Sequence, residues 1–118
     1  MALRARLSRE EFDELVEQAV AQLPRVFREK LSNVSIVVED LPPQGERDGD
    51  ALMGLFEGIP MTEKSVFQAA GPDRVFLYQR NIESACRTRK ELVREIRLTL
   101  LHELGHYFGL SEEELEDI

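Results

Sequence analysis

Several residue types and patterns that define common protein classes are scarce in this 118-residue sequence. Its single cysteine, Cys86, has no partner for an internal disulfide and cannot build a thiolate metal cluster alone. Its hydrophobic runs are far shorter than the roughly 20 apolar residues that cross a bilayer, and its first twelve residues, MALRARLSREEF, contain no apolar signal segment. These absences predict a soluble, cytoplasmic protein without membrane association, in which histidine and carboxylate side chains hold any metal.

The sequence also has few basic residues relative to acidic ones. It contains 15 lysine and arginine residues and 23 aspartate and glutamate residues, which gives a formal net charge of −8. Such a field repels a phosphate backbone, which excludes nucleic acid as a partner. At this length, with 42% hydrophobic residues, the chain fits one compact domain that spans residues 1–118 and buries one core.

The N-terminal part of the sequence predicts a helix with a defined start. Ser8 and Glu11 form the pattern of a capping box, in which a hydroxyl and a carboxylate bind free backbone amides at a helix start. Apolar residues then recur at spacings of three and four as far as Leu23, and Pro24 ends or bends that helix. Residues 25–31 are predicted to continue as a short helix.

Three segments in the middle of the chain favour extended structure. Residues 34–39 form an alternating β-branched run, which is typical of a mostly buried strand, and residues 74–80 predict a second strand after a Gly-Pro turn. Residues 51–60 are apolar but interrupted by glycine and proline, which favours an edge or bulged strand. Residues 41–50 combine prolines, glycines and charges and are predicted to form an exposed loop.

A second helical pattern runs from about Lys90 to Phe108, and its apolar residues cover much of the helix circumference, so we expect it to be buried near its C-terminal half. Gly109 supplies a left-handed stop to this helix. Ser111 and Glu114 repeat the capping-box pattern and predict a last short helix.

The only two histidines of the chain lie in this second helical segment, in the string His102-Glu103-Leu104-Gly105-His106. Helix positions four apart differ by about 40° around the axis, so both imidazoles leave the same face and can bind one metal ion. Glu103 stands beside them, placed to accept a proton from a water molecule whose pKa the metal lowers. The alternative is a pair of ordinary core or surface histidines beside a solvated glutamate.

A catalytic zinc ion usually has three protein ligands, so a third ligand is needed. A helix that ends at Gly109 can fold the next segment back, and Glu112 follows three residues later, where a metzincin has its third histidine. Glu112 is therefore the first choice, although it could equally be an acid in the first turn of the last helix, after the Ser111 cap. Other acids nearby could replace it as ligand: Glu113, Glu116 and Asp117.

Three further residues have side chains with the chemistry of a functional group. Tyr78 and Tyr107 could each donate a hydrogen bond to an oxyanion, but core packing is the more frequent role of a tyrosine. Cys86 has no obvious base, since both histidines are committed elsewhere, and we expect it to be a small buried apolar residue without a catalytic role.

Three stretches of the sequence carry a resemblance to a known family. They are residues 54–60 (GLFEGIP), 72–83 (PDRVFLYQRNIE) and 101–109 (LHELGHYFG), and the last is the most specific because it joins the histidine pair to the helix-ending glycine. On these stretches the chain resembles the minimal zincin-like metallopeptidase family of small bacterial proteins. The resemblance implies an α+β fold in which a small twisted mixed sheet packs against an N-terminal helix and an active-site helix.

The resemblance also implies metal-dependent hydrolysis of peptide bonds, with His102 and His106 as metal ligands and Glu103 as general base. The third ligand differs from the histidine of metzincins and from the distant helical glutamate of gluzincins, so we expect the single zinc ion to bind weakly.

The sequence therefore predicts a zinc-dependent metallopeptidase that acts on a peptide or protein substrate. An extended peptide could add to the predicted edge strand by main-chain hydrogen bonds, which makes its central residues the substrate-binding candidates: Leu55, Phe56, Glu57 and Gly58. One alternative is a non-catalytic interaction module that keeps the zincin scaffold, with or without metal, and binds a protein partner. Another is a metal-dependent hydrolase of a non-peptide amide.

Overall fold

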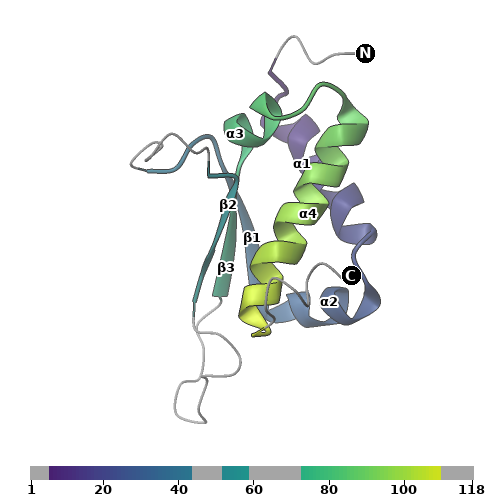
Figure 1. Cartoon of the computed structure of the whole chain (residues 1–118), viewed down its shortest axis with the longest axis vertical. Helices are drawn as coiled ribbons and strands as arrows, with labels where there is room; N and C mark the ends of the chain where they lie inside the picture. Colours follow the sequence, from purple (N-terminus) through teal and green to yellow (C-terminus); the bar gives the residue numbers. More distant parts are fainter. Residues whose placement is uncertain (1–5, 44–51, 59–72, 110–118) are drawn as a thin grey trace.

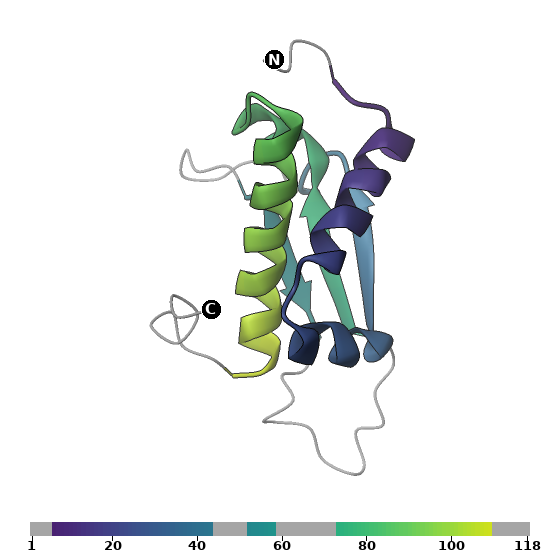
Figure 2. The ribbon, with the colours of Figure 1, turned by 90° about the vertical axis from the view of Figure 1, so that its right-hand side faces the viewer.

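The computed structural model describes residues 6–43, 52–58 and 73–109 of the chain. Two long helices lie side by side on one face of a small sheet (Figures 1 and 2). This arrangement confirms the predicted α+β class and the packing of the sheet against an N-terminal helix and the histidine-bearing helix. The elements in chain order are α1 (Arg9–Ala21), α2 (Arg25–Lys30), η1 (Leu31–Asn33), β1 (Val34–Glu39), β2 (Gly54–Glu57), β3 (Asp73–Tyr78), α3 (Gln79–Ser84) and α4 (Arg89–Tyr107).

In the described part of the chain the sheet has three strands in the order β1-β3-β2, with β1 parallel and β2 antiparallel to the central β3. The prediction of an edge strand within residues 51–60 is confirmed, since β2 pairs with β3 alone among these strands. Strand β1 is also an outer strand. It is half-buried rather than mostly buried, because it lies at the side of the sheet and the helices cover one face. Most of the predicted loop at residues 41–50 lies outside the described residues.

The start of α1 is fixed by the capping box that the sequence predicts. The Ser8 hydroxyl accepts a hydrogen bond from the Glu11 backbone N–H at 3.0 Å, and the Glu11 carboxylate accepts one from the Ser8 N–H at 3.0 Å. The pKa of Glu11 is lowered, first by the Ser8 backbone N–H and then by Arg89. Helix α1 ends just before Pro24, and α2 supplies the predicted short continuation.

The hydrophobic core lies between the two long helices and the central strand. Helix α4 contributes Leu92, Ile96 and Leu100, none of which is accessible to solvent, and β3 contributes the equally buried Val75 and Leu77. Burial is distributed along the whole of α4 rather than concentrated in its C-terminal half. Helix α4 is therefore anchored along its length, which gives the side chains on its remaining face a rigid support.

The predicted strand at residues 74–80 ends early. Strand β3 stops at Tyr78, and the chain turns directly into α3, a helix that the sequence pattern did not indicate. The helix is held by tertiary contacts of its polar residues: the buried Asn81 donates its side-chain N–H to the Leu52 carbonyl at 2.8 Å. This bond fixes the chain just before β2.

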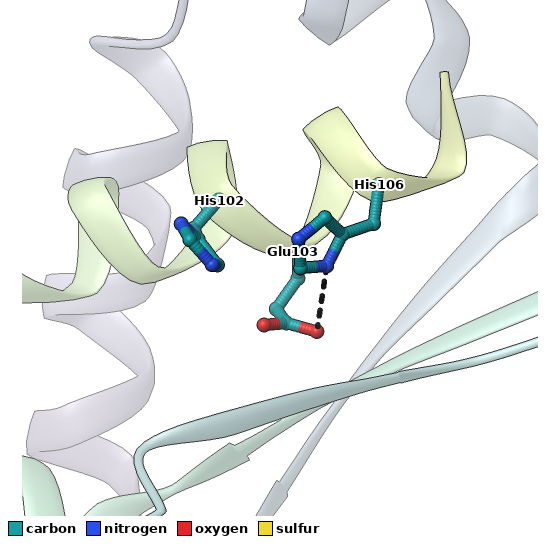
Figure 3. A group of neighbouring side chains, drawn as sticks. All are labelled: His102, Glu103 and His106. Carbon is teal, nitrogen blue, oxygen red and sulfur yellow. Dashed lines mark ion pairs between the residues drawn. The ribbon is translucent and has the colours of Figure 1, made fainter. Parts of the chain in front are cut away.

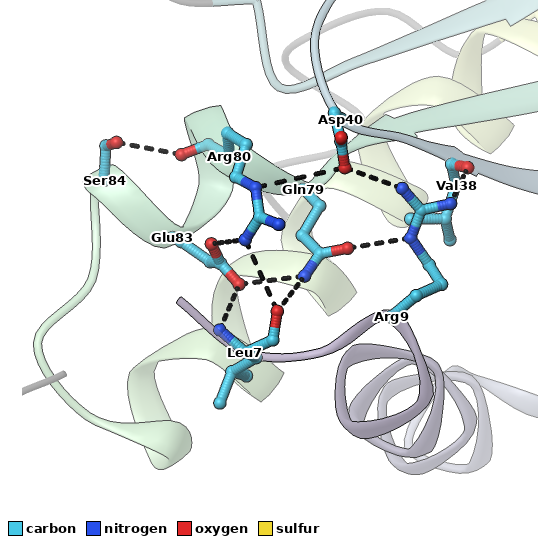
Figure 4. Close-up of polar contacts among 8 residues, drawn as sticks. All are labelled: Leu7, Arg9, Val38, Asp40, Gln79, Arg80, Glu83 and Ser84. Carbon is cyan, nitrogen blue, oxygen red and sulfur yellow. Dashed lines mark hydrogen bonds and ion pairs between the residues drawn. The ribbon is translucent and has the colours of Figure 1, made fainter. Parts of the chain in front are cut away.

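A buried amide links α3 to the start of α1 (Figure 4). Gln79, which has no solvent exposure, donates its side-chain N–H groups to the Leu7 carbonyl and to Glu83, both at 3.0 Å, and its side-chain oxygen accepts from Arg9 Nε at 2.9 Å. Arg9 also donates to the Val38 carbonyl at 2.7 Å, so the same network holds α1 against β1. Each hydrogen-bonding group of the Gln79 side chain thus has a partner, as burial requires.

Gly109 follows α4 with φ = 76°, the left-handed conformation that its position predicts. The short helix predicted to follow, with its Ser111 and Glu114 cap, lies outside the described residues. Within the part of the chain that the structure describes, no helix has the length and apolar character needed to span a membrane.

Candidate metal centre

The two histidines meet on one face of α4 (Figure 3). The imidazoles of His102 and His106 have ring centroids 4.6 Å apart and meet edge to face, at an interplanar angle of 73°. One ligand atom from each histidine and one carboxylate oxygen of Glu103 lie within 4.8 Å of one another. The helix spacing therefore gathers the three side chains as the sequence predicts.

The donor set suits a zinc ion. Imidazole nitrogens bind zinc at about 2.0–2.1 Å, so two of them on one ion are separated by at most about 4 Å. In the structure a ligand nitrogen of His102 and one of His106 lie within 4.8 Å of each other, slightly above this limit. His106 is exposed over 45% of its side chain, which leaves room for an ion and a substrate on this side of α4.

Glu103 is held between the helix and the sheet. Its side chain is 15% exposed, and its Oε1 accepts a hydrogen bond from the backbone N–H of Phe56 at 2.7 Å. The same oxygen lies 4.0 Å from Nδ1 of His106 (Figure 3). The carboxylate thus connects the histidine pair to the main chain of β2, a contact that joins residues 47 positions apart and that no local pattern indicates.

Successive residues of β2 direct their main-chain N–H and C=O groups alternately toward β3 and toward the side of the metal centre. The Met53 carbonyl accepts a hydrogen bond from the Tyr78 N–H at 2.9 Å, so the main-chain groups of Met53 point toward β3. In an antiparallel pair every second residue turns its N–H and C=O away from the partner strand. Gly54 and Phe56 are those residues, and the bond from Phe56 to Glu103 follows from this alternation.

The four predicted substrate-binding residues are not equivalent in the structure. Phe56 contacts Glu103 through its main chain, and its ring packs on Tyr107 with centroids 5.2 Å apart. Leu55 is exposed, Glu57 forms an ion pair with Arg74, and Gly58 lies against Asp73. Phe56 is thus joined to the histidine-bearing helix by both its main chain and its ring.

Gly54 allows β2 to approach α4 beside Glu103. A Cβ atom at this position would lie 2.6 Å from Cγ2 of Thr99 and 3.0 Å from the Phe76 carbonyl oxygen. The absence of a side chain is therefore required by packing, and it sets the distance between the strand and the helix next to the candidate base. The sequence contains the signal, a glycine within an apolar strand, but does not show which element approaches it.

The other residues that the sequence singles out are either buried or outside the described residues. Tyr78 and Tyr107 are both buried, in agreement with core packing, and the pKa of Tyr78 is raised by burial and by the nearby carboxylates of Glu39, Glu57 and Glu103. Cys86 is buried as expected, and burial raises the pKa of its thiol to about 11. The proposed third metal ligand, Glu112, and the neighbouring acids that could replace it lie outside the described residues.

Comparisons with known proteins agree with this geometry. A family model described as zincin-like metallopeptidase matches residues 31–118. Among solved structures, a conserved hypothetical protein from Thermus thermophilus is similar, with 27% sequence identity and a TM-score of 0.57 over 86% of this chain and 94% of that chain. No curated protein matches the chain. The matched region includes β2, β3 and α4, the elements that form the candidate centre.

Proposed function

This chain belongs to the zincin-like metallopeptidase family, and on that premise we propose that it is a zinc-dependent peptidase that hydrolyses peptide bonds. The observation that carries the proposal is the cluster of His102, Glu103 and His106 on one face of α4, with the glutamate bound to the edge strand beside it. The substrate is a peptide or protein, since the candidate centre adjoins a strand edge that an extended chain can pair with.

His102 and His106 would hold the zinc ion, with Glu112 as the third ligand. When bound, zinc supplies a Lewis acid that polarises the substrate carbonyl and lowers the pKa of a water molecule. Two imidazoles and one carboxylate are a ligand set that zinc accepts in catalytic sites.

Glu103 acts as the general base and then as the general acid. Its carboxylate accepts a proton as water attacks the carbonyl carbon and donates that proton to the nitrogen of the leaving amine. The hydrogen bond from the Phe56 N–H holds Oε1 in place, so that the carboxylate does not have to be ordered when substrate arrives.

The edge of β2 would position the substrate. Gly54 presents an outward N–H and C=O, and Phe56 presents an outward C=O, whereas the Phe56 N–H is bound to Glu103. An extended peptide could pair with these three groups beside the histidines. Leu55, Glu57 and Gly58 would then shape the strand and its surroundings rather than contact the reacting atoms. This separates the role of the main chain, which aligns the peptide, from that of the side chains on α4.

The test is a comparison of wild type with Glu103→Gln, both loaded with zinc and incubated with an unstructured protein chain such as denatured casein. Both should bind one equivalent of zinc by elemental analysis. Wild type should cleave, lose activity with a chelator and regain it with zinc, and the variant should be slower by about 10²–10⁴-fold. Glu14→Gln, which changes an exposed carboxylate on α1, is the matched control and should keep full activity.

Equal turnover by Glu103→Gln would remove this glutamate from the mechanism. Failure of wild type to bind zinc, together with absence of cleavage, would refute the peptidase proposal and leave a scaffold that binds a protein partner. Zinc binding without peptide cleavage, combined with hydrolysis of a non-peptide amide, would instead redirect the proposal to another substrate class.

A further inference from the structure

A hollow of about 410 Å³ opens beside His102 and Glu103. It lies between the start of β2 and the two turns of α4 that come before His102. Its other walls are largely apolar. Leu52 and Leu98 flank it and are exposed over 43% and 41% of their surfaces, and Met53 adds a half-buried side chain. Large apolar side chains left partly exposed around one hollow indicate a surface that a ligand can cover.

One wall of the hollow carries the carboxylate of Glu95, which pairs with no cation among the described residues. Glu95 is half-buried there, two turns before His102. On a helix, its neighbours one turn away are Glu91, Leu92, Leu98 and Thr99, none of which is a cation. Among the described residues, no ion pair includes Glu95, although arginine residues elsewhere on α1, α3 and β3 all pair with acids.

We propose that this hollow binds a lysine or arginine side chain of the substrate, with its aliphatic stem against Leu52 and Leu98 and its charged end on Glu95. The inference rests on the proposed peptidase function and names the substrate class. Lysine and arginine are the side chains that combine a long apolar stem with a cationic end. Glu95 lies about 10 Å along the helix from His102, a separation that requires a long side chain. The net charge of −8 also attracts cationic peptides.

Other side chains fit the hollow less well. A leucine would cover the apolar walls but would remove water from the Glu95 carboxylate without giving it a partner, which costs free energy. An acidic side chain would be repelled by Glu95 and by Glu91 one turn away. The combination of apolar walls and the Glu95 carboxylate therefore discriminates in favour of a cation.

The direction of the strand predicts which substrate residue enters the hollow. A peptide that adds to β2 in the antiparallel sense runs from the Glu57 end toward the Gly54 end, and the hollow adjoins Leu52, Met53 and Gly54. The residue on the carboxyl side of the cleaved bond thus reaches Glu95. Cleavage is expected on the amino side of lysine or arginine.

The test uses zinc-loaded wild type and Glu95→Gln with four unstructured peptides that differ at one position: lysine, norleucine, leucine or glutamate. Norleucine keeps the stem of lysine without its charge. For wild type we expect kcat/KM to be roughly five- to tenfold higher for lysine than for norleucine, which corresponds to about 1–1.4 kcal/mol. Mass spectrometry should place the cut before the lysine. In Glu95→Gln the preference should vanish, because the lysine peptide loses its charged partner and the norleucine peptide no longer removes water from a carboxylate, and Glu14→Gln should behave as wild type.

Equal cleavage of the lysine and norleucine peptides by wild type would overturn the inference while leaving the peptidase proposal intact. If no peptide is cleaved, the peptidase proposal fails, and binding then decides this inference separately. Fluorescence anisotropy with zinc-loaded Glu103→Gln should show tighter binding of the lysine peptide than of the norleucine peptide, and this difference should be lost in the Glu95→Gln, Glu103→Gln double variant. Equal affinities would refute a cation site.

Discussion

Replacing Gly54 by alanine should destabilise the protein, because the added methyl group has no space. Its Cβ would lie 2.6 Å from Cγ2 of Thr99 and 3.0 Å from the Phe76 carbonyl oxygen, and Thr99 is a β-branched residue with little freedom to move away. Overpacking of this kind costs about 1–3 kcal/mol. Alanine also restricts the unfolded chain, which offsets about 0.5–1 kcal/mol. A net loss of about 1–2 kcal/mol is expected, or a fall in Tm of roughly 5–10 °C.

The assay is urea denaturation of wild type, Gly54→Ala, Thr99→Ala and the double variant. Thr99→Ala removes the nearest atom of the clash, so the double variant should recover about 1 kcal/mol relative to the sum of the single changes. Recovery should be incomplete, since the Phe76 carbonyl oxygen remains 3.0 Å from the new Cβ. Leu55→Ala, at the next position of β2 and exposed, is the control and should change stability by less than about 0.5 kcal/mol.

Gly54→Ala with wild-type stability would show that β2 does not approach α4 closely at this point. A double variant as unstable as the sum of its parts would show that Thr99 is not the source of the clash. Either result would also argue against the proposed positioning of Glu103. The close approach of β2 to α4 is what brings the Phe56 N–H within 2.7 Å of the Glu103 carboxylate.

Two further predictions concern parts of the molecule away from the metal centre. Gln79→Leu should lower the free energy of unfolding by about 1–3 kcal/mol, because the buried Leu7 carbonyl loses a donor, and a urea midpoint equal to that of wild type would contradict the role of the network in Figure 4. Because burial raises the pKa of the Cys86 thiol to about 11, native protein should react slowly with iodoacetamide at pH 8 and much faster in urea, and equal rates would show that the thiol is accessible.

The sequence predicted those elements whose signals are local. Ser8 and Glu11 bind each other's backbone amides as the capping-box pattern requires, and the apolar periodicity of residues 90–108 gave α4 to within one residue at each end. The histidine pair followed from helix geometry alone, because a spacing of four residues places both rings on one face.

The sequence could not predict features that depend on distant contacts. Helix α3 was missed because Gln79 and Asn81 are stabilised by bonds to Leu7 and Leu52, which lie far away in the chain. The bond between the Phe56 N–H and Glu103 was missed for the same reason, since it depends on which elements pack together. The half-burial of β1 likewise reflects its place at the side of the sheet, a property of topology rather than of its β-branched residues.

In the described part of the sheet, a charged side chain from a helix occupies one outward main-chain group of each outer strand. Arg9 of α1 donates to the Val38 carbonyl of β1, and Glu103 of α4 accepts from the Phe56 N–H of β2, both at 2.7 Å. Open strand edges invite copies of a protein to join edge to edge and aggregate, and side chains that occupy the free main-chain groups oppose this. Glu103, which is proposed to move protons, would thus also oppose self-association at this edge. A glutamine at this position would keep that effect, because its side-chain oxygen can still accept the hydrogen bond.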